Sequence, residues 1–503
     1  PTVGVDIASA ADDDGLLPPP PEDDDAGALR AGGAPHLLSR ESLGLLAQYA
    51  AVGLINGTLP NTIMPFMTYY LNMEGAATTS ARALLGIPWS LKVVASLCLY
   101  AMAYIPLGAP YFSNPALRKI KPADYTPADV MTLNKEAPTS GAAYIVLMML
   151  ASLGYLFADV AADAITAIYA VRFLFNIFAQ LLVGFGLSTP PYGGDFSVGL
   201  SFPVVMFILA TFCLPIVPLT WYFVREQQVK APHFKTYLAD FWGILQSKAV
   251  YQVIAYLFCS GVFGGFSYVA SDPITSYWVR ATSFNLSVSG MLGSGVMVAT
   301  LVFTGKYGLD WNWRTMQVTT TLVIVAIDAT CTMVVTWDYL RSKWFWLGLP
   351  IAEAVPVGMS FLISTYVVVE LAGTGHEGAI YGLLTTVGNL AGPFALTLTK
   401  TANASFKVHN DDIMNDTYEV RRDVTITILL SYAMKIGSLV FLPWLPSQKA
   451  ATQQLKREGG KSPTIGKITV AYLLFALTWS VLSNLLSIFK STRCSWITGG
   501  CQE

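Results

Sequence analysis

Long apolar segments separated by short polar segments make up most of this 503-residue chain. A helix needs about 20 apolar residues to cross a bilayer. The pattern predicts membrane spans at 43–71, 83–106, 143–188, 199–223, 249–271, 286–304, 316–337, 344–370, 378–399, 423–444 and 468–489. The segment 143–188 is too long for one straight helix, so it is expected to fold as two. The predicted fold class is therefore an all-α, polytopic membrane protein.

The composition agrees with a membrane protein and argues against other classes. Hydrophobic residues make up 53% of the chain and charged residues 12%, whereas a soluble domain carries about 25% charged residues. The net charge of −2 gives no basis for a nucleic-acid partner. The sequence shows no phosphate-binding glycine loop or dinucleotide fingerprint, and its cysteines lack zinc-ligand spacing. We therefore expect no cofactor, no metal and no enzyme activity.

Polar breaks divide the chain into regions. We expect a disordered, acidic and proline-rich cytosolic tail at 1–40, an N-terminal helical bundle at 41–224, a cytosolic linker at 225–248, a C-terminal helical bundle at 249–445, a basic cytosolic loop at 446–467, an additional transmembrane helix at 468–490 and a C-terminal tail at 491–503.

Basic residues orient the second half of the chain, because cytosolic loops carry an excess of Lys and Arg. The loop 445–467 carries five basic residues against Glu458 alone, so we expect it in the cytosol. The loop 224–248 is also basic, and six intervening spans place it on the same side. The loop 400–422 then lies outside, in agreement with its two glycosylation sequons.

Two short patterns recur and predict an internal repeat. Gly57, Pro65 and Tyr69 recur at the same spacing as Gly265, Pro273 and Tyr277, and Ala167-Ile-Tyr169 recurs as Ala379-Ile-Tyr381. The patterns favour two related helical halves, as in transporters whose substrate site lies between repeats.

Two aspartates are the strongest chemical signal. Asp159 and Asp163 lie in the apolar segment 143–188 and, at i and i+4, share one helix face. A carboxylate in a membrane span costs at least about 2.5–3.5 kcal/mol, so it is tolerated mainly where it lines a polar pathway or has a partner. The pair could carry a coupling proton or accept hydrogen bonds from an amino-bearing substrate. The alternative is a solvated helix end, or pairing with Arg172 alone.

Further polar residues interrupt apolar segments. Trp89 and Lys92 follow a proline-broken turn. Lys92 could bind an anionic group of a solute, and Trp89 could stack on its ring. Alternatively, both residues anchor the helix at the membrane interface. Glu377 begins a predicted helix that continues to Asn389, and at this first position the helix dipole would stabilise its carboxylate for a functional role. The alternative interpretation is that this segment is only a capped cytosolic turn. Single intramembrane polar residues are Asn56, Gln180, Asp272, Asp328 and Glu353, of which Glu353 is a cavity candidate and Asp272 is expected to cap a helix.

Three motifs together resemble the signatures of the folate–biopterin transporter family of the major facilitator superfamily. They are Gly-Ile-Pro-Trp-Ser-Leu-Lys at 86–92, Ala-Asp-Val-Ala-Ala-Asp-Ala at 158–164, and Gly-His-Glu-Gly-Ala-Ile-Tyr at 375–381 with Asn389. The resemblance extends from about residue 43 to 445 and is to oomycete-type members. It implies two helical bundles around a central cavity, alternating access, and proton-linked uptake of pterins or folates through Lys92, Asp159, Asp163 and Glu377.

The chain departs from this family in its N-terminal half. Apolar residues continue without a break from Val93 to Pro106, and only a short stretch separates Ala164 from Arg172. Each departure is consistent with a missing helix segment. If each removes one crossing, the loop 107–141 faces the cytosol.

The sequence thus predicts a proton-coupled secondary transporter of pterin- or folate-like solutes in a plasma or organelle membrane. A carboxylate can accept the amino group and ring N–H of a pterin together, and Lys92 or Arg172 would meet the carboxylates of folate. Alternatives are a carrier of another organic anion or a nucleoside-like solute, a non-transporting receptor or decayed paralogue, and an intramembrane hydrolase that pairs Asp159 with a second acid such as Glu353.

Overall fold

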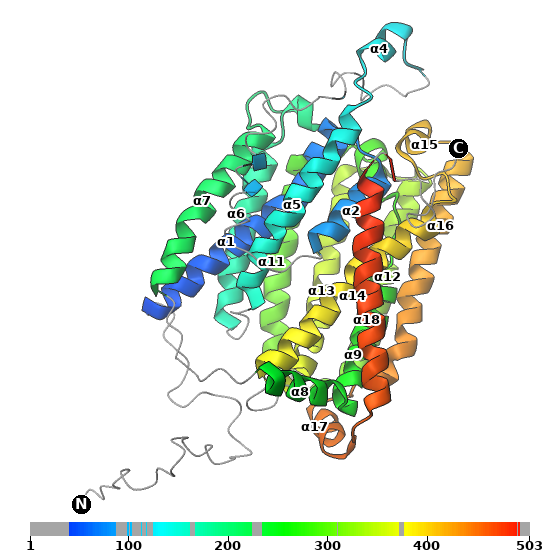
Figure 1. The fold of residues 1–503 in the computed structure, drawn as a ribbon. Coiled ribbons are helices and arrows are strands. Elements are labelled where there is room, and N and C mark those ends of the chain that lie inside the picture. The colour runs from blue at the N-terminus through cyan, green and yellow to red at the C-terminus, as the bar shows by residue number, and fades with distance from the viewer. Residues whose placement is uncertain are drawn as a thin grey trace, which may run out of the picture.

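Helices form almost all of the described structure. The computed structural model describes residues 40–86, 98–99, 101–102, 112, 117, 124–160, 166–223, 234–308, 310–371, 377–489 and 491–492. Within these ranges no strand is present, only an isolated bridge between Ser247 and Lys461. The helices stand side by side as a tilted bundle (Figure 1). The chain is all-α, as the sequence predicts.

The two halves of the chain contribute matching sets of long helices. The first half forms α1 (Arg40–Thr62) with the π-helix η1 (Ile63–Tyr70), α2 (Gly75–Gly86), α5 (Ala137–Val160), α6 (Thr166–Gly186) and α7 (Phe202–Phe223). The second half forms α9 (Lys248–Gly264), α10 (Ser271–Pro273) with the π-helix η6 (Ile274–Trp278), α11 (Ser283–Tyr307), α12 (Trp313–Thr336), α13 (Lys343–Leu371), α14 (Glu377–Asn403) and α16 (Tyr418–Gly437) with η7 (Ser438–Trp444). The apolar segment 143–188 therefore folds as two helices, α5 and α6, as expected.

Short helices occupy the two ends of the bundle, and one more long helix follows the repeats. The helices α8 (Phe234–Leu245) and α17 (Lys449–Glu458) lie at one end. The helices α4 (Pro127–Thr132) and α15 (Asn410–Asn415) lie at the other (Figure 1). The last helix, α18 (Pro463–Ile488), packs against α2, α9 and α14.

The internal repeat is confirmed in the backbone. α9 begins 208 residues after α1, at Lys248 and Arg40, and α11 begins 208 residues after α2, at Ser283 and Gly75. The hydrogen bonds that end the two π-helices also match: the N–H of Leu71 donates to Phe66 O and that of Met73 to Met67 O, as Val279 donates to Ile274 O and Ala281 to Thr275 O. Asn72 (φ 53°) and Arg280 (φ 54°) take the same left-handed conformation at equivalent positions.

A proline explains why each π-helix forms where it does. Pro65 and Pro273 have no N–H to donate to the preceding turn, and their rings crowd the carbonyl four residues earlier. The helix adapts by widening, and such π-segments occur often at functional sites. The recurring proline in the sequence therefore marks a recurring backbone irregularity, which both halves keep.

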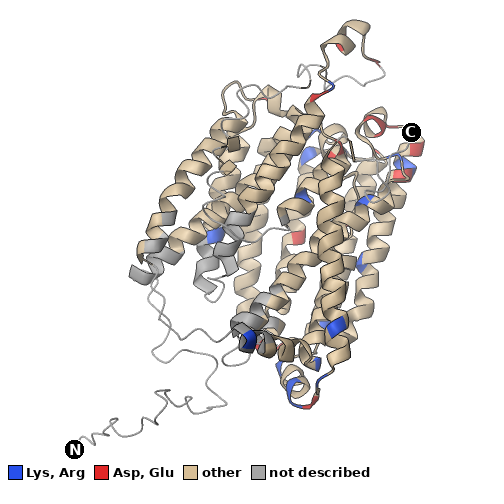
Figure 2. Ribbon diagram, in the orientation of Figure 1, with Lys and Arg blue, Asp and Glu red and all other residues tan. Residues whose placement is uncertain are grey.

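The chain is an integral, multi-pass membrane protein. Five described helices, α11, α12, α13, α16 with η7, and α18, are long and apolar enough to cross a bilayer. Large apolar side chains such as Phe178, Val302 and Phe475 are exposed on the outside of the bundle, where lipid would cover them. In the described part of the chain, most charged residues lie toward the two ends of the helices (Figure 2).

The helix α4, in the loop 107–141, lies at the end of the bundle opposite to α17, whereas the sequence predicts both segments on the same side. The basic helix α17, with Lys449, Lys456 and Arg457, lies in the loop that we expect in the cytosol because of its excess of positive charge. We call the opposite end the outer end. α4, in the loop 107–141, lies at the outer end with α15 (Figure 1), and Tyr125 interacts electrostatically with Asp411 there.

The predicted span 83–106 contains only the end of α2, which begins at Gly75 and runs inward from the end of the bundle where α15 lies. Its first turns are rich in Ala, Thr and Ser and contain Arg82, so their hydropathy is too low to mark a span. The sequence pattern therefore sets the start of this span too late.

Glycine allows α1 and α6 to lie in close contact. A Cβ at Gly53 would stand 2.3 Å from the carbonyl oxygen of Arg172, and a Cβ at Gly57 would stand 2.6 Å from the Cβ of Ala179. Small residues of this kind let membrane helices approach and gain dispersion energy along their whole contact. The glycine of the repeated pattern thus has a packing role in the first half.

We predict that Gly53→Ala destabilises the N-terminal bundle. The added methyl overlaps the Arg172 carbonyl, and overpacking of this kind costs about 1–3 kcal/mol. The control is Gly348→Ala in α13, which has open space at that position and gains helix propensity. Thermal unfolding of the purified chain in detergent should show a lower midpoint for the first variant only. Equal midpoints would contradict the close packing.

Candidate functional site

The structure places the residues predicted from sequence unevenly. Trp89, Lys92 and Asp163 lie outside the described residues. Asp159 lies in the last turn of α5 and Glu377 begins α14, but their side chains also lie outside the described part. The roles of these five residues therefore stay predictions.

The remaining three predicted residues are described. Arg172 is partly buried on α6 and its backbone carbonyl faces Gly53 of α1. Asn389 is exposed on α14. Glu353 is partly buried on α13 and lies near other charged groups of the second half.

The cluster around Glu353 joins three helices of the C-terminal half. Asp328 of α12 and Lys435 of α16 form an ion pair, with 3.7 Å between Lys435 Nζ and Asp328 Oδ2 and only 7% of the Asp328 side chain exposed. The carboxylate of Glu353 interacts electrostatically with both. The described ion pair is that of Asp328 and Lys435, and Glu353 contributes a second acid near it.

Hydroxyl groups extend this cluster. The hydroxyls of Thr332 and Tyr432 lie 2.7 Å apart, and Tyr432 also interacts with Asp328. Removal of one partner from a buried ion pair costs about 3–5 kcal/mol, because the other charge stays buried without compensation. The ion pair and the hydroxyl contact therefore join α12 to α16 as long as the charges stay balanced.

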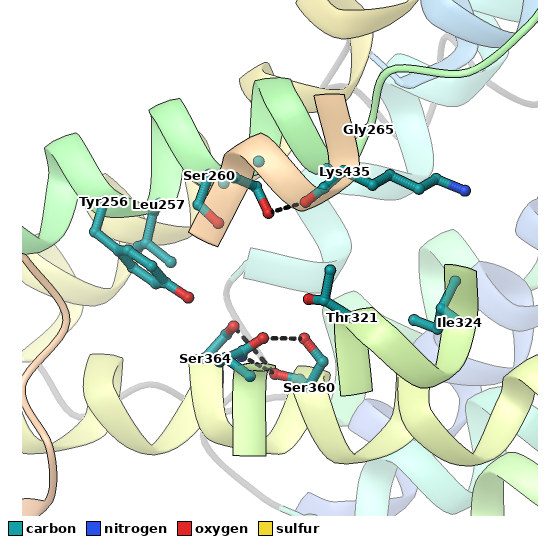
Figure 3. Close-up of a pocket in the computed structure, with 14 residues that line it drawn as sticks. Tyr256, Leu257, Ser260, Gly265, Thr321, Ile324, Ser360, Ser364 and Lys435 are labelled. Atoms are coloured by element: carbon teal, nitrogen blue, oxygen red, sulfur yellow. Dashed lines mark hydrogen bonds between the residues drawn. The ribbon is translucent and has the colours of Figure 1, made fainter. Parts of the chain in front are cut away.

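A cavity of about 370 Å³ lies beside this cluster inside the C-terminal half. Helices α9, α12, α13, α14 and α16 with η7 form its walls. Its polar lining includes Ser260, Gln317, Thr321, Ser360, Ser364 and Ser438 (Figure 3). None of these six residues stood out in the sequence, because single serines and threonines are common in membrane helices.

The two halves of the chain meet at the outer end through the repeated π-helices. The hydroxyl of Tyr69 donates to the carbonyl of Ala281, from the first half to the second. In return the hydroxyl of Tyr277, which is the repeat equivalent of Tyr69, donates to Asn72 Oδ1 at 3.0 Å. Ser276 also donates to the sulfur of Met64, 3.6 Å away. We call these six residues, with Arg82 and Asp272, the outer junction.

An ion pair crosses the outer junction. Arg82 of α2 donates to both carboxylate oxygens of Asp272, at 3.1 and 3.4 Å, and Thr78 donates to the same carboxylate at 3.2 Å. We expected Asp272 to cap a helix; instead its side chain bonds to the opposite half of the chain. The sequence gave no sign of this pairing, because Arg82 lies 190 residues away.

A buried lysine reinforces the contact between the halves. Lys400 of α14 is only 4% exposed, and its Nζ donates to Ser80 Oγ of α2 at 3.2 Å. Ser487 of α18 donates to the same Ser80 oxygen at 2.8 Å. The additional helix α18 thus joins the contact between the two halves. Sequence analysis missed Lys400, since it follows directly after the predicted span 378–399.

The loop that contains α15 forms a latch over the outer junction. The backbone N–H of Asn410 donates to Glu74 Oε2 at 3.1 Å, and its side-chain amide donates to the carbonyl of Met73. His409 Nδ1 lies 3.8 Å from the same Glu74 oxygen. The latch therefore attaches the second half to the first at the start of α2.

Comparisons with known proteins give a likeness of fold. No protein-family model matches the chain, and no curated protein matches it. Among solved structures it is similar to a D-xylose–proton symporter, with 12% identity over 80% of this chain and 97% of that one and a TM-score of 0.48. It is also similar to the nucleoside transporter NupG, with 14% identity over 78% and 97% and a TM-score of 0.44.

A third solved structure is a bacterial homolog of the human lysosomal transporter Spinster in an inward-facing, occupied conformation. The identity is 11%, over 84% of this chain and 98% of that one, with a TM-score of 0.45. All three TM-scores lie below 0.5, so the function below is drawn from this chain's own residues. The resemblance to the folate–biopterin transporters rests on the three sequence motifs alone.

We predict that the latch holds best at acid pH. The nearby carboxylate of Glu74 is the main reason why the pKa of His409 is raised above its ordinary value; Asp411 and Asp412 act in the same direction. A raised pKa means that the stabilisation is complete below about pH 6.5 and is lost as pH rises through the raised pKa. Because His409 is half exposed, the effect should stay below about 1 kcal/mol.

Thermal unfolding of wild type and His409→Gln, from about pH 5 to about pH 9, measures this effect. The wild type should be the more stable form at acid pH, and the two curves should converge at alkaline pH. Glu74→Gln removes the same partner and should give the same convergence. Parallel curves across the whole range would show that His409 does not act through Glu74.

Proposed function

We propose that this chain is a secondary active transporter that moves pterin- or folate-like solutes across a membrane, coupled to protons, by alternating access between its two helical halves. The observation that carries the proposal is the outer junction. There, two repeats that are equivalent in backbone and sequence meet through reciprocal hydrogen bonds of Tyr69 and Tyr277.

A repeat-based junction suits a protein that must open and close. Equivalent segments on each half allow the halves to rock against one another about a pseudo-twofold axis, as in transporters built from internal repeats. Polar contacts at a junction can exchange their partners for water when it opens. Each such hydrogen bond contributes about 0.5–1.5 kcal/mol net, so the closed state is favoured by an amount that a bound solute can overcome.

The ion pair Arg82–Asp272 fits the same role. Arg82 is 41% exposed at its side chain, so water can reach the pair. Partly exposed pairs contribute about 0–1 kcal/mol to stability. The pair therefore favours the closed state but is weak enough to break when the halves separate.

Proton coupling requires acids that can change their charge in the membrane. In the second half Asp328 pairs with Lys435 and Glu353 lies near both, and the motif aspartates Asp159 and Asp163 supply acids in the first half. A carboxylate in a membrane span is a functional candidate because its desolvation is expensive. Each half thus contains acids that could take up and release a proton during transport.

The substrate class rests on the three motifs at 86–92, 158–164 and 375–381. A pterin ring offers an amino group and a ring N–H that one aspartate accepts together. The motif lysine Lys92 offers a cation for the carboxylates of folate, and Trp89 offers a flat face for the ring. The carriage of another organic anion or a nucleoside-like solute is the alternative within transport.

Uptake of labelled biopterin and folate by cells that express the chain tests the proposal. Uptake should exceed that of cells with an empty vector and should rise with an inward proton gradient. Asp163→Asn should lower it at least about tenfold, which corresponds to about 1.4 kcal/mol. Asp129→Asn, in the exposed helix α4, is the matched control and should leave uptake unchanged.

Two results would count against the proposal. Saturable binding of either solute to the purified chain without uptake would point to a receptor. Uptake that is unchanged in Asp163→Asn would remove the motif aspartate from the pathway.

A further inference from the structure

Among the described residues, those that line the cavity in the C-terminal half present both polar and apolar groups to it and no free charge. Lys435 is the charged residue among those that line it. The chain of Lys435 extends away from the cavity (Figure 3), and its Nζ pairs with Asp328 at 3.7 Å. A charged solute would therefore find no partner at the walls and would lose its hydration, which is costly. This lining favours a neutral solute.

The hydroxyl groups of the walls present mainly acceptors to the cavity. Ser364 Oγ donates to Ser360 O at 3.1 Å, and Ser438 Oγ donates to Lys435 O at 2.6 Å. Ser360 Oγ donates to Gln317 Oε1 at 2.9 Å. A hydroxyl has one donor and two acceptor lone pairs, so each of these serines has used its donor and can still accept. A solute that supplies O–H or N–H donors matches them.

The acceptors lie on different walls. Ser360 and Ser364 belong to α13, Ser438 belongs to η7 at the end of α16, and Thr321 of α12 points its hydroxyl inward (Figure 3). A flat solute with donors along one edge would engage one wall. A compact solute with hydroxyls on several sides would engage all of them.

Glycines make room for such a solute. Gly264 of α9 and Gly388 of α14 line the cavity, and neither has any atom within 4 Å of the place where a Cβ would stand. Glycine in a membrane bundle usually brings two helices into contact, as Gly53 does. At Gly264 and Gly388 it leaves open space instead. The volume of about 370 Å³ falls in the range of about 300–1,000 Å³ typical of small-molecule sites.

We propose that this cavity binds a neutral, hydroxyl-rich solute, a sugar or a polyol, at a site separate from the pathway of the motif aspartates. The site lies within one half of the chain, whereas alternating access acts between the halves. Its occupation fixes α9, α12, α13, α14 and α16 relative to one another. Binding there does not depend on pterin or folate transport, and the two proposals can fail separately.

Binding to the purified full chain in lipid nanodiscs tests the proposal. The neutral probes are D-glucose, D-mannitol and myo-inositol, and the charged analogues are D-gluconate and D-glucosamine, all measured by calorimetry and by the shift in unfolding temperature. At least one neutral probe should bind saturably and raise the unfolding temperature. If D-glucose binds, D-gluconate and D-glucosamine should each bind at least about tenfold more weakly than D-glucose.

Variants of α14 locate the site. Gly388→Leu fills the open space and should abolish binding of the neutral probe. Gly392→Leu is the matched control, since Gly392 is one turn further along α14, also has open space around it and does not line the cavity. It should bind as the wild type does. The unfolding temperature of each variant without ligand shows whether it is folded.

A second variant keeps the test decisive if Gly388→Leu does not fold. Thr321→Val keeps the side-chain shape and removes one acceptor, so the affinity should fall about threefold to tenfold, as expected for the loss of one hydrogen bond. The proposal is overturned if no neutral probe binds saturably, if charged and neutral probes bind alike, or if Gly388→Leu or Thr321→Val, when folded, binds as the wild type does.

Discussion

The reciprocal hydrogen bonds between the two π-helix repeats are the contact on which the rest of this structure depends. Tyr69 reaches the carbonyl of Ala281, and its repeat equivalent Tyr277 reaches Asn72. Each tyrosine stands on a helix that a proline has widened, and each acceptor lies where the chain turns back. Because each repeat donates one tyrosine hydroxyl to the other, one junction can hold two halves that are more than 200 residues apart in sequence.

These polar contacts stabilise the fold because they lie among apolar helices in a membrane. A polar group without a partner is expensive in an apolar medium, so Lys400, Asp272 and Asp328 must each be paired, and each pair joins different helices. Some pairs join the two halves at the outer end. The pair Asp328–Lys435 instead stabilises the second half alone, beside the polar cavity. The polar residues thus separate into a junction between halves and a site within one half.

The sequence predicts those features that depend on local pattern. Apolar length predicts the helices, and the recurrence of Gly57, Pro65 and Tyr69 predicts the repeat that the backbone confirms. Features that depend on distant pairing could not be predicted. The sequence suggests a helix cap for Asp272 because its partner Arg82 is remote in the chain. It does not predict the start of α2 because the residues of its first turns are small and polar. The cavity could not be predicted either, since it is built from single hydroxyl residues on several helices.

The central claim is that the outer junction must open during each cycle, and a reversible cross-link tests it most directly. Met64→Cys and Ser276→Cys place two thiols at positions whose native side chains already touch across the junction, with 3.6 Å between Ser276 Oγ and Met64 Sδ. Bridging of the thiols with a short, reducible reagent should stop solute uptake, reduction should restore it, and each single-cysteine variant should stay active under the same treatment. Uptake that continues at full rate with the junction bridged would contradict the account.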